Sequence, residues 1–600
     1  MPNVKFVSWC LLGFSLALAG CKTVAPPAPV ATPAAVPPPP VATGAAVEPD
    51  LKPASAAAGA WGMTLVVASP LKLVADLDAL SKSVELPLPL GQSLLPTLTS
   101  LFDPSVAKMS RETLDHLDAS RPLAVVWLAQ GSDAPAGWCA AIAFKERPSA
   151  LDSLHGIGTA GAQNPGVVER RLPSGEPVWG AVKDRQLLLS SSRETLLAAA
   201  ALAITAQATP MSGQALFTLS PSVMARSTGQ SLDVVASSVL RAALADMEKD
   251  TTGKGKLITP AAKRMTEALL PILVRPLTEI AVVRVSLDIG SGRGVVLRAE
   301  VQPTPGSDLA AKVAHGSPYA FDSDLPVHSD ASAVVGWGDM APWLADVTTV
   351  VEASGPAGQA ASRDLRAVFG ESLDGGSCAA DVGSVPIHMM CSLSVRPGVD
   401  ASAALTKYLA FVQSSNAWEA EIDGRKAKPI KVKRAGKVVE IEKTIERKDP
   451  QAVAVMKGIV GGERVHAAMT VKKGRVIIAM GPKPREMLDS YGKQQQPVKT
   501  TAPILARTLL DTAGADTLGS VDVASVITKL AMTSKDARNA PLGGMMMTMP
   551  ALAELRAPVV LTGQAKGGPA IELQIPFGSL QNVARVVSAF MGQMGAPPAR

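Results

Sequence analysis

Acidic side chains gather around one histidine between residues 322 and 330. Carboxylate oxygens and an imidazole nitrogen are ligands that suit Ca²⁺ or Mn²⁺. The stretch contains Pro326 and no glycine, however, whereas a calcium loop needs a glycine to wrap the backbone around its ion. A solvated segment between two folded units explains the acids as well, so we expect no metal and no other cofactor. The candidate ligands are Asp322, Asp324, His328 and Asp330.

A basic run at residues 424–448 is the strongest electrostatic feature of the chain. It holds ten Lys and Arg against three Glu, an excess larger than the net charge of +6 of all 600 residues. The stretch from Ile430 to Glu442 alternates with period two around Ala435-Gly436, which predicts a protruding hairpin. The candidate contact residues are Arg425, Lys426, Lys428, Lys431, Lys433, Arg434 and Lys437.

Two interpretations of this basic run stay open. It can contact anionic lipid headgroups, lipopolysaccharide phosphates or an acidic envelope protein. Alternatively, it is a solvated hairpin whose cations are balanced by Glu across the strands. The run has no aromatic residues to stack on bases, and the chain as a whole is only mildly basic, so we expect no nucleic-acid partner.

Two short patterns match enzyme motifs but lack the required context. Gly156–Gly161 fits G-x-G-x-x-G, yet residues 162–166 cannot start a helix, so we expect a loop there and no cofactor. Ser69-Pro70-Leu71-Lys72 fits S-x-x-K, but no S-D-N or K-T-G element follows, and Ser69 is explained as a helix cap. We therefore expect a non-enzymatic binding or scaffold protein. A hydrolase or transferase whose active site is not visible as a linear motif stays open as the alternative.

The first 21 residues form a short targeting segment. Lys5 is followed by an uncharged run from Phe6 to Gly20, too short to span a bilayer, that ends in Leu18-Ala19-Gly20-Cys21. This resembles the lipobox signal peptide of bacterial lipoproteins. The resemblance covers residues 1–21 and implies that residues 1–20 are cleaved off and that acyl chains on Cys21 bind the protein to a membrane. Lys22 stands where Asp would favour the inner membrane, so we expect an outer-membrane location in the cell envelope.

Residues 21–60 are expected to form a disordered Pro/Ala-rich tether behind the lipidated cysteine. Ten prolines interrupt this stretch, and no period of two or 3.6 is present. Such a segment is biased toward polyproline II and reaches at most roughly 120 Å when fully extended.

Of the five cysteines in the full sequence, three keep a free sulfur for other chemistry once Cys10 is cleaved off and Cys21 is acylated. Cys378 and Cys391 flank a turn-like Val382–Pro386, so that as a hairpin they would face each other within disulfide reach. The periplasm permits that bond, although the free form stays open. Cys139 is expected to be a buried free thiol.

The body from Trp61 onward contains recurring local patterns. A short apolar strand followed by a capping residue and an amphipathic run occurs four times, at Leu65–Pro70, Leu216–Pro221, Val334–Asp339 and Leu518–Asp522. A second pattern, a strand pair entering a helix, occurs at residues 182–196 and 471–488. The spacing suggests an ancient duplication of a unit of roughly 270 residues.

We therefore predict an α+β fold made of two tandem related units. Adjacent hairpins at residues 279–302 and 559–576, mixed with helices, favour antiparallel sheets with packed helices in each unit. Apolar residues make up 47% of the chain and charged residues 18%, which excludes general disorder. The expected domains are a first unit at 61–310, a linker at 311–331 and a second unit at 332–600.

Overall fold

The computed structural model places the body of the chain in a set of separate stretches. The structure describes residues 61–83, 120–128, 137–146, 159–164, 167–171, 177–209, 213–227, 259–290, 294–315, 332–381, 386–445, 461–493, 517–522, 557–564 and 570–582, with the shorter pieces 118, 211, 230–234, 237–238, 321–322, 324–325, 457 and 460.

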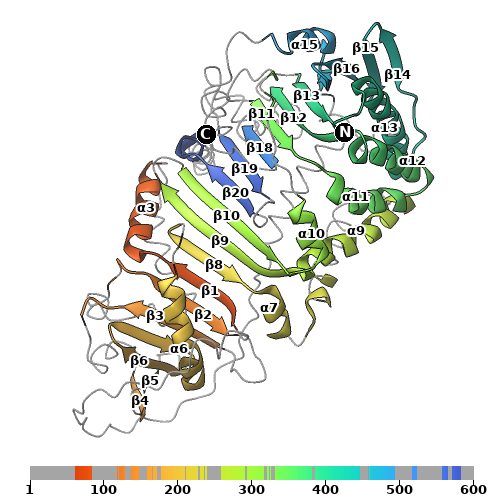
Figure 1. Ribbon diagram of the computed structural model, residues 1–600. Helices are drawn as coiled ribbons and strands as arrows, with labels where there is room; N and C mark the ends of the chain where they lie inside the picture. Colours follow the sequence, from red (N-terminus) through yellow and green to blue (C-terminus); the bar gives the residue numbers. More distant parts are fainter. Residues whose placement is uncertain are drawn as a thin grey trace, which may run out of the picture. The chain divides into compact units, whose positions relative to one another are not determined.

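Twenty strands form one sheet in the described part of the chain (Figure 1). The first ten are β1 (Trp61–Val67), β2 (Leu123–Leu128), β3 (Gly137–Ala143), β4 (Thr159–Asn164), β5 (Val167–Arg171), β6 (Pro177–Lys183), β7 (Gln186–Ser190), β8 (Ala215–Leu219), β9 (Ile280–Gly290) and β10 (Gly294–Pro303). The second ten are β11 (Ser332–Trp337), β12 (Leu373–Asp381), β13 (His388–Val395), β14 (Lys431–Ala435), β15 (Val438–Thr444), β16 (Arg464–Lys472), β17 (Arg475–Met480), β18 (Thr517–Asp522), β19 (Pro558–Gln564) and β20 (Ala570–Ile575).

Every pairing in this sheet is antiparallel. The first ten strands lie in the order β4-β5-β6-β7-β3-β2-β1-β8-β9-β10. The second ten lie in the order β14-β15-β16-β17-β13-β12-β11-β18-β19-β20, which is the same order. β10 pairs with β20, so the two sets join into one sheet whose end strands are β4 and β14.

Helices connect strands along the chain, and α13 is 22 residues long. They are α3 (Pro70–Ser83), α6 (Arg193–Ala208), α7 (Pro221–Ser227), α9 (Pro260–Thr278), α10 (Asp308–Ala314), α11 (Ala341–Ala353), α12 (Pro356–Leu365), the π-helix η3 (Arg366–Gly370), α13 (Ala401–Ile422) and α15 (Pro484–Ser490). α3 begins at Pro70, and the hydroxyl of Ser69 accepts a hydrogen bond from the Lys72 amide, as expected of a helix cap.

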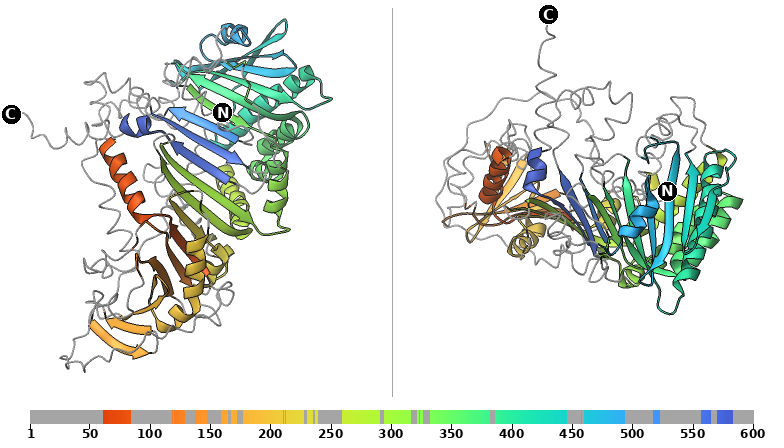
Figure 2. Two further views of the ribbon diagram at one scale, coloured as in Figure 1. Left: turned by 60° about the vertical axis from the view of Figure 1, so that its left-hand side comes forward. Right: turned by 90° about the horizontal axis from the view of Figure 1, so that it is seen from above.

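Helices cover both faces of the sheet. α6 packs on β2 and β3, where its Leu196 joins a core with Val126 and Leu188. The strand register places α15 on the same face, with Leu488 against Ile477. We call this the α6 face. Figure 2 (right) shows α3 on the side opposite α6.

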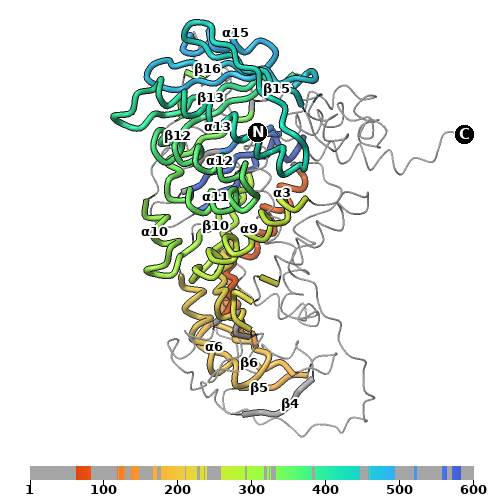
Figure 3. The backbone as a smooth tube through the Cα atoms, turned by 90° about the vertical axis from the view of Figure 1, so that its right-hand side faces the viewer, coloured from red at the N-terminus to blue at the C-terminus, as the bar shows by residue number. Residues whose placement is uncertain are grey.

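The other face carries the larger helical layer in the second half of the chain. α13 places Leu405 and Phe411 against Val476 and Ile478, which alternate along β17 with the residues of the α6 face. Strands buried on both faces have continuous apolar runs, and β17 is apolar from Val476 to Met480 accordingly. Figure 3 shows α9, α11, α12 and α13 beside one another. We call this the α13 face.

The α+β class and the antiparallel arrangement are confirmed. The strands of the two predicted units lie in one sheet, because β10 pairs with β20. The expected linker at 311–331 needs correction, since α10 occupies Asp308–Ala314 and Leu325 is fully buried in the core of the second half. The expected loop at Gly156–Gly161 overlaps strand β4, which begins at Thr159.

Candidate functional site

The predicted basic hairpin consists of β14 and β15, at one end of the sheet. Gly436 turns the chain between the strands with a φ of +64°, which glycine adopts without the strain of a Cβ. β15 pairs with β16 on its other side, and its Val439 and Ile441 are buried. The expectation of a protruding hairpin is therefore wrong, since β15 is an internal strand and only β14 is an end strand.

Lysine and glutamate face each other across this hairpin. Lys431 is paired with Glu442 and Lys433 with Glu440, on the α6 face. Lys431 Nζ lies 3.1 Å from Glu442 Oε1, and 71% of the Lys431 side chain is exposed. This is the cross-strand balance that one of the two sequence interpretations predicts.

Two arginines add positive charge to the same surface. Arg464 Nη1 lies 2.7 Å from Glu442, and Arg485 Nη1 of α15 lies 3.5 Å from Glu440. Sequence reasoning missed both arginines, because they lie 16 and 37 residues beyond the end of the basic run at residue 448. The pairing of β15 with β16 places Arg464 there, and the packing of α15 on β16 places Arg485. We call this group the cationic edge: Lys431, Lys433, Arg464 and Arg485, with Glu440 and Glu442.

The cationic edge retains an excess of positive charge. Hydrogen bonding from Lys431, with the nearby charges of Arg464 and Lys431 itself, holds the pKa of Glu442 below its ordinary value. Four cations lie around the two carboxyl groups of Glu440 and Glu442. The surplus is available to an anionic partner.

The remaining predicted contact residues lie elsewhere. Arg425 is mostly buried and pairs with Asp423 at 3.3 Å, so it does not belong to a contact surface. Arg434 lies on the α13 face of β14, opposite Val439. Lys426, Lys428 and Lys437 are exposed in the segments before β14 and in its turn.

Asp322 is buried within a polar network on the α6 face. Its side chain is 7% exposed, and its Oδ2 accepts hydrogen bonds from the Tyr491 hydroxyl at 2.7 Å and from the Ser392 hydroxyl. Arg475 Nη1 lies 3.5 Å away, and the backbone N–H of Asp322 donates to Ser377 Oγ at 3.1 Å. The expectation that Asp322 belongs to a solvated linker is therefore wrong.

The network keeps Asp322 ionised. Burial alone raises the pKa of this carboxyl, but hydrogen bonds from Ser392 and Tyr491 outweigh burial and place the pKa below its ordinary value. Burial, together with the hydrogen bond to this carboxylate, raises the pKa of the Tyr491 hydroxyl. The Asp322 carboxylate, the Ser392 hydroxyl and the Tyr491 hydroxyl all have hydrogen-bond partners within this network. The contacts hold Asp322 against β13 and β17 and leave no free nucleophile among these groups.

The candidate metal ligands are not brought together as a site in the described part of the chain. Asp324 pairs with Lys473 at 2.6 Å, and its backbone N–H donates to Asp322. His328 and Asp330 lie outside the described residues. Among the described residues, no group of three or more His, Cys, Asp or Glu side chains is arranged to hold a metal ion.

The cysteines are placed as follows. Cys378 and Cys391 occupy directly paired positions of β12 and β13, and a disulfide joins them. Cys139 is a buried free thiol in β3, and burial raises its pKa to about 12. A thiol that is protonated at neutral pH is neither a nucleophile nor a metal ligand.

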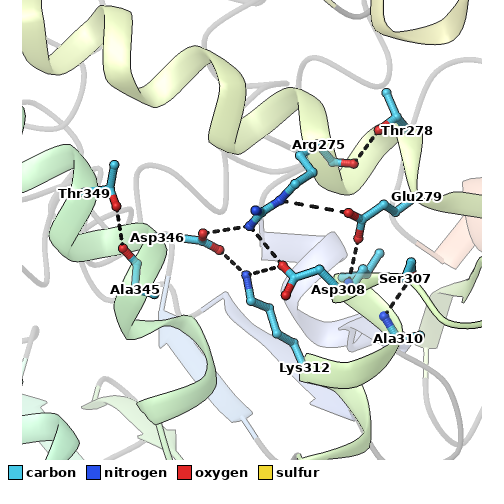
Figure 4. Close-up of polar contacts among 11 residues, drawn as sticks. Arg275, Thr278, Glu279, Ser307, Asp308, Ala310, Lys312, Ala345, Asp346 and Thr349 are labelled. Carbon is cyan, nitrogen blue, oxygen red and sulfur yellow. Dashed lines mark hydrogen bonds and ion pairs between the residues drawn. The ribbon is translucent and has the colours of Figure 1, made fainter.

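A second charged cluster joins three helices of the α13 side (Figure 4). Lys312 of α10 lies 2.7 Å from Asp308 and pairs with Asp346 of α11. Arg275 of α9 contacts Asp346 at 2.8 Å and Asp308 at 2.9 Å. The cluster braces the helices and has no spare charge of either sign large enough to suggest a ligand.

Comparisons extend this picture little. Among the described residues, no helix has the length and apolar character needed to cross a membrane. No family model matches the chain, and neither a curated protein nor a solved structure matches it.

Proposed function

We propose that this chain is a lipid-anchored binding or scaffold protein of the bacterial cell envelope, without enzymatic activity, that contacts an anionic partner through the cationic edge. The observation that carries the proposal is the surplus of positive charge at this end of the sheet. Among the described residues, the cations of Lys431, Lys433, Arg464 and Arg485 lie around the two carboxyl groups of Glu440 and Glu442. An envelope protein or an anionic lipid would supply the opposite charge.

The proposed location rests on the lipobox at residues 18–21. Acyl chains on Cys21 hold the protein at the outer membrane, and residues 22–60 act as the tether between the anchor and the first strand, β1, at Trp61. The Cys378–Cys391 disulfide supports this location, because such bonds persist in oxidising compartments such as the periplasm.

We infer that the two halves arose by duplication of one ten-strand unit. The identical strand order of β1–β10 and β11–β20 supports this inference. So do Asp184 and Lys473, non-glycine residues with φ of 54° and 51° that occupy the same turn, between β6 and β7 and between β16 and β17. A positive φ is uncommon outside glycine, so its recurrence at one topological position supports common descent.

Crosslinking in living cells tests the proposal. Tagged wild-type protein, the double variant Lys431→Glu/Lys433→Glu and the control Lys72→Glu/Lys263→Glu are crosslinked, and the partners are identified by mass spectrometry. The control changes the net charge equally at two exposed helix positions. We expect the same partners with wild type and control and their loss with the edge variant. Identical partners from all three proteins would show that the cationic edge is not the contact.

A further inference from the structure

We propose that the free side of β14 accepts an extended segment of a partner protein, in which acidic and aliphatic residues alternate, as an additional strand of the sheet. This inference rests on the proposed function and specifies how the anionic partner is bound.

The backbone of β14 provides the first support for this inference. Of the described strands, β14 pairs with β15 alone. An end strand presents backbone N–H and C=O groups of every second residue on its unpaired side, which is a template for another strand. Main-chain hydrogen bonds of this kind supply affinity in β-strand addition, while alternate side chains supply specificity.

The sequence of β15, the strand that already pairs with β14, provides further support. Glu440, Ile441 and Glu442 of β15 lie directly opposite Lys433, Val432 and Lys431. A strand added to the other side meets the same three side chains of β14, because neighbouring strands share the direction of each side chain at paired positions. The complement that β14 selects within the molecule is therefore acidic, aliphatic, acidic.

The lysines of β14 determine which strands can pair with it favourably. Lysines on an edge discourage pairing with neutral strands, since burying their charges beside apolar side chains is unfavourable. Two carboxylates opposite Lys431 and Lys433 remove this penalty. Within the part of the chain that the structure describes, the four cations of the cationic edge share Glu440 and Glu442, so two further carboxylates would complete the balance.

The two end strands of the sheet, β4 and β14, differ in charge. β4 occupies the position in the first half that β14 occupies in the second, and its sequence Thr-Ala-Gly-Ala-Gln-Asn contains no charged residue. The fold therefore does not require cations on its end strand. A protein strand is favoured over a lipid surface, because a surface of headgroups would leave the unpaired backbone N–H and C=O groups of β14 without strand partners.

Binding of capped synthetic peptides to the full chain tests this inference. The probe is Thr-Val-Glu-Ile-Glu-Val-Thr. One control peptide carries N-methyl groups on alternate amides, which removes donors along one side of the strand and keeps the charges. A second control has the same composition with the two Glu adjacent. The proteins are wild type, Lys431→Gln/Lys433→Gln and the control Lys72→Gln/Lys263→Gln, with urea unfolding to verify that each is folded.

We expect the probe to bind wild type and control alike, and to bind about tenfold more weakly when either the two lysines or the amide donors are removed. Equal binding of the N-methylated peptide would overturn strand addition while leaving an electrostatic contact, and thus the proposed function, intact. Failure of every peptide, with lysine-dependent binding to vesicles of anionic phospholipid, would also overturn it and identify a lipid as the partner. Loss of lysine dependence in both this assay and the crosslinking experiment would remove the proposed function as well.

Discussion

At the scale of single residues, Asp322 shows how a charge is kept in the interior. Its carboxylate accepts hydrogen bonds from Ser392 and Tyr491 and lies near Arg475, which offsets the cost of desolvation. Register with β7 and β17 equates Ser392 with Ala141, which has no hydroxyl, so the hydrogen bond from Ser392 has no counterpart at that position of the first half.

Replacement of Asp322 by Asn should destabilise the fold by about 2 kcal/mol at pH 7, because it removes charge-assisted hydrogen bonds from a buried site. The folded-state pKa of Asp322 lies below its ordinary value, so the carboxylate contributes fully above the unfolded-state pKa of about 3.9. That contribution disappears as the pH falls through the lower folded-state pKa.

Urea unfolding at pH 7 and at pH 3 measures this effect. The difference between wild type and Asp322→Asn should shrink at the lower pH. Asp324→Asn is the matched control, since its ion pair with Lys473 is largely exposed and should be worth less than about 1 kcal/mol. Equal losses in the two variants would contradict a special role for Asp322.

At the scale of elements, α9 ties the first half of the chain to helices of the second half. Its Arg275 pairs with Asp346 of α11, its Arg264 donates to the carbonyl of Ala353 at 3.1 Å, and Thr259 at its start donates to the carbonyl of Ile422. Together with the β10–β20 pairing, these contacts make a second connection between the halves.

Replacement of Lys312 by Met should cost about 3 kcal/mol, because it leaves two carboxylates with one cation fewer in a partly buried cluster. Lys312 is 10% exposed, pairs with Asp308 and Asp346, and lies 5.5 Å from the centroid of the Trp343 ring. Those carboxylates, in turn, raise the pKa of Lys312 above its ordinary value despite the opposing effect of burial.

Equilibrium unfolding in urea checks this prediction, with Lys263→Met as the control. Lys263 is exposed on α9 and lies 4.0 Å from Glu267, so its loss should change stability by less than about 0.5 kcal/mol. A comparable loss in both variants would show that the brace contributes nothing specific.

At the scale of the whole molecule, the anchor and the folded body are separate questions. The lipobox predicts that wild-type protein sediments with membranes and is released only by detergent. Cys21→Ala should appear in the soluble periplasmic fraction, because no acyl chain can be attached. Fractionation and immunoblotting measure this, with Cys10→Ala as the control that should stay membrane-bound. Continued membrane association of Cys21→Ala would contradict the lipobox.

Local patterns in the sequence predicted many elements correctly. The strand-to-helix junction at Leu65–Pro70 became β1 and α3, and the hairpins predicted at residues 279–302 and 559–576 became the strand pairs β9–β10 and β19–β20. These features depend on neighbours along the chain, on proline and glycine, and on alternation of apolar residues, all of which are legible without knowledge of distant contacts.

Distant pairings were not legible, and they decide the site. Arg464 belongs to the cationic edge because β15 lies between β14 and β16, and Arg485 belongs to it because α15 packs on β16. No sequence pattern near residues 424–448 predicts either contact. Asp322 looked like part of an acidic, solvated segment, yet Ser392 and Tyr491 receive it in the interior. A buried charged side chain needs hydrogen-bond or ion-pair partners, and here those partners are distant in the sequence, so composition alone cannot predict the burial.

The sequence by itself determined the α+β class, the antiparallel hairpins, the helix cap at Ser69 and the basic character of residues 424–448, because each follows from local periodicity, turn chemistry and charge. The tertiary structure alone decided that twenty strands form one sheet, that β14 is an end strand and that two distant arginines adjoin it. Strand order depends on which edges meet in space, and the same alternating pattern is compatible with many orders.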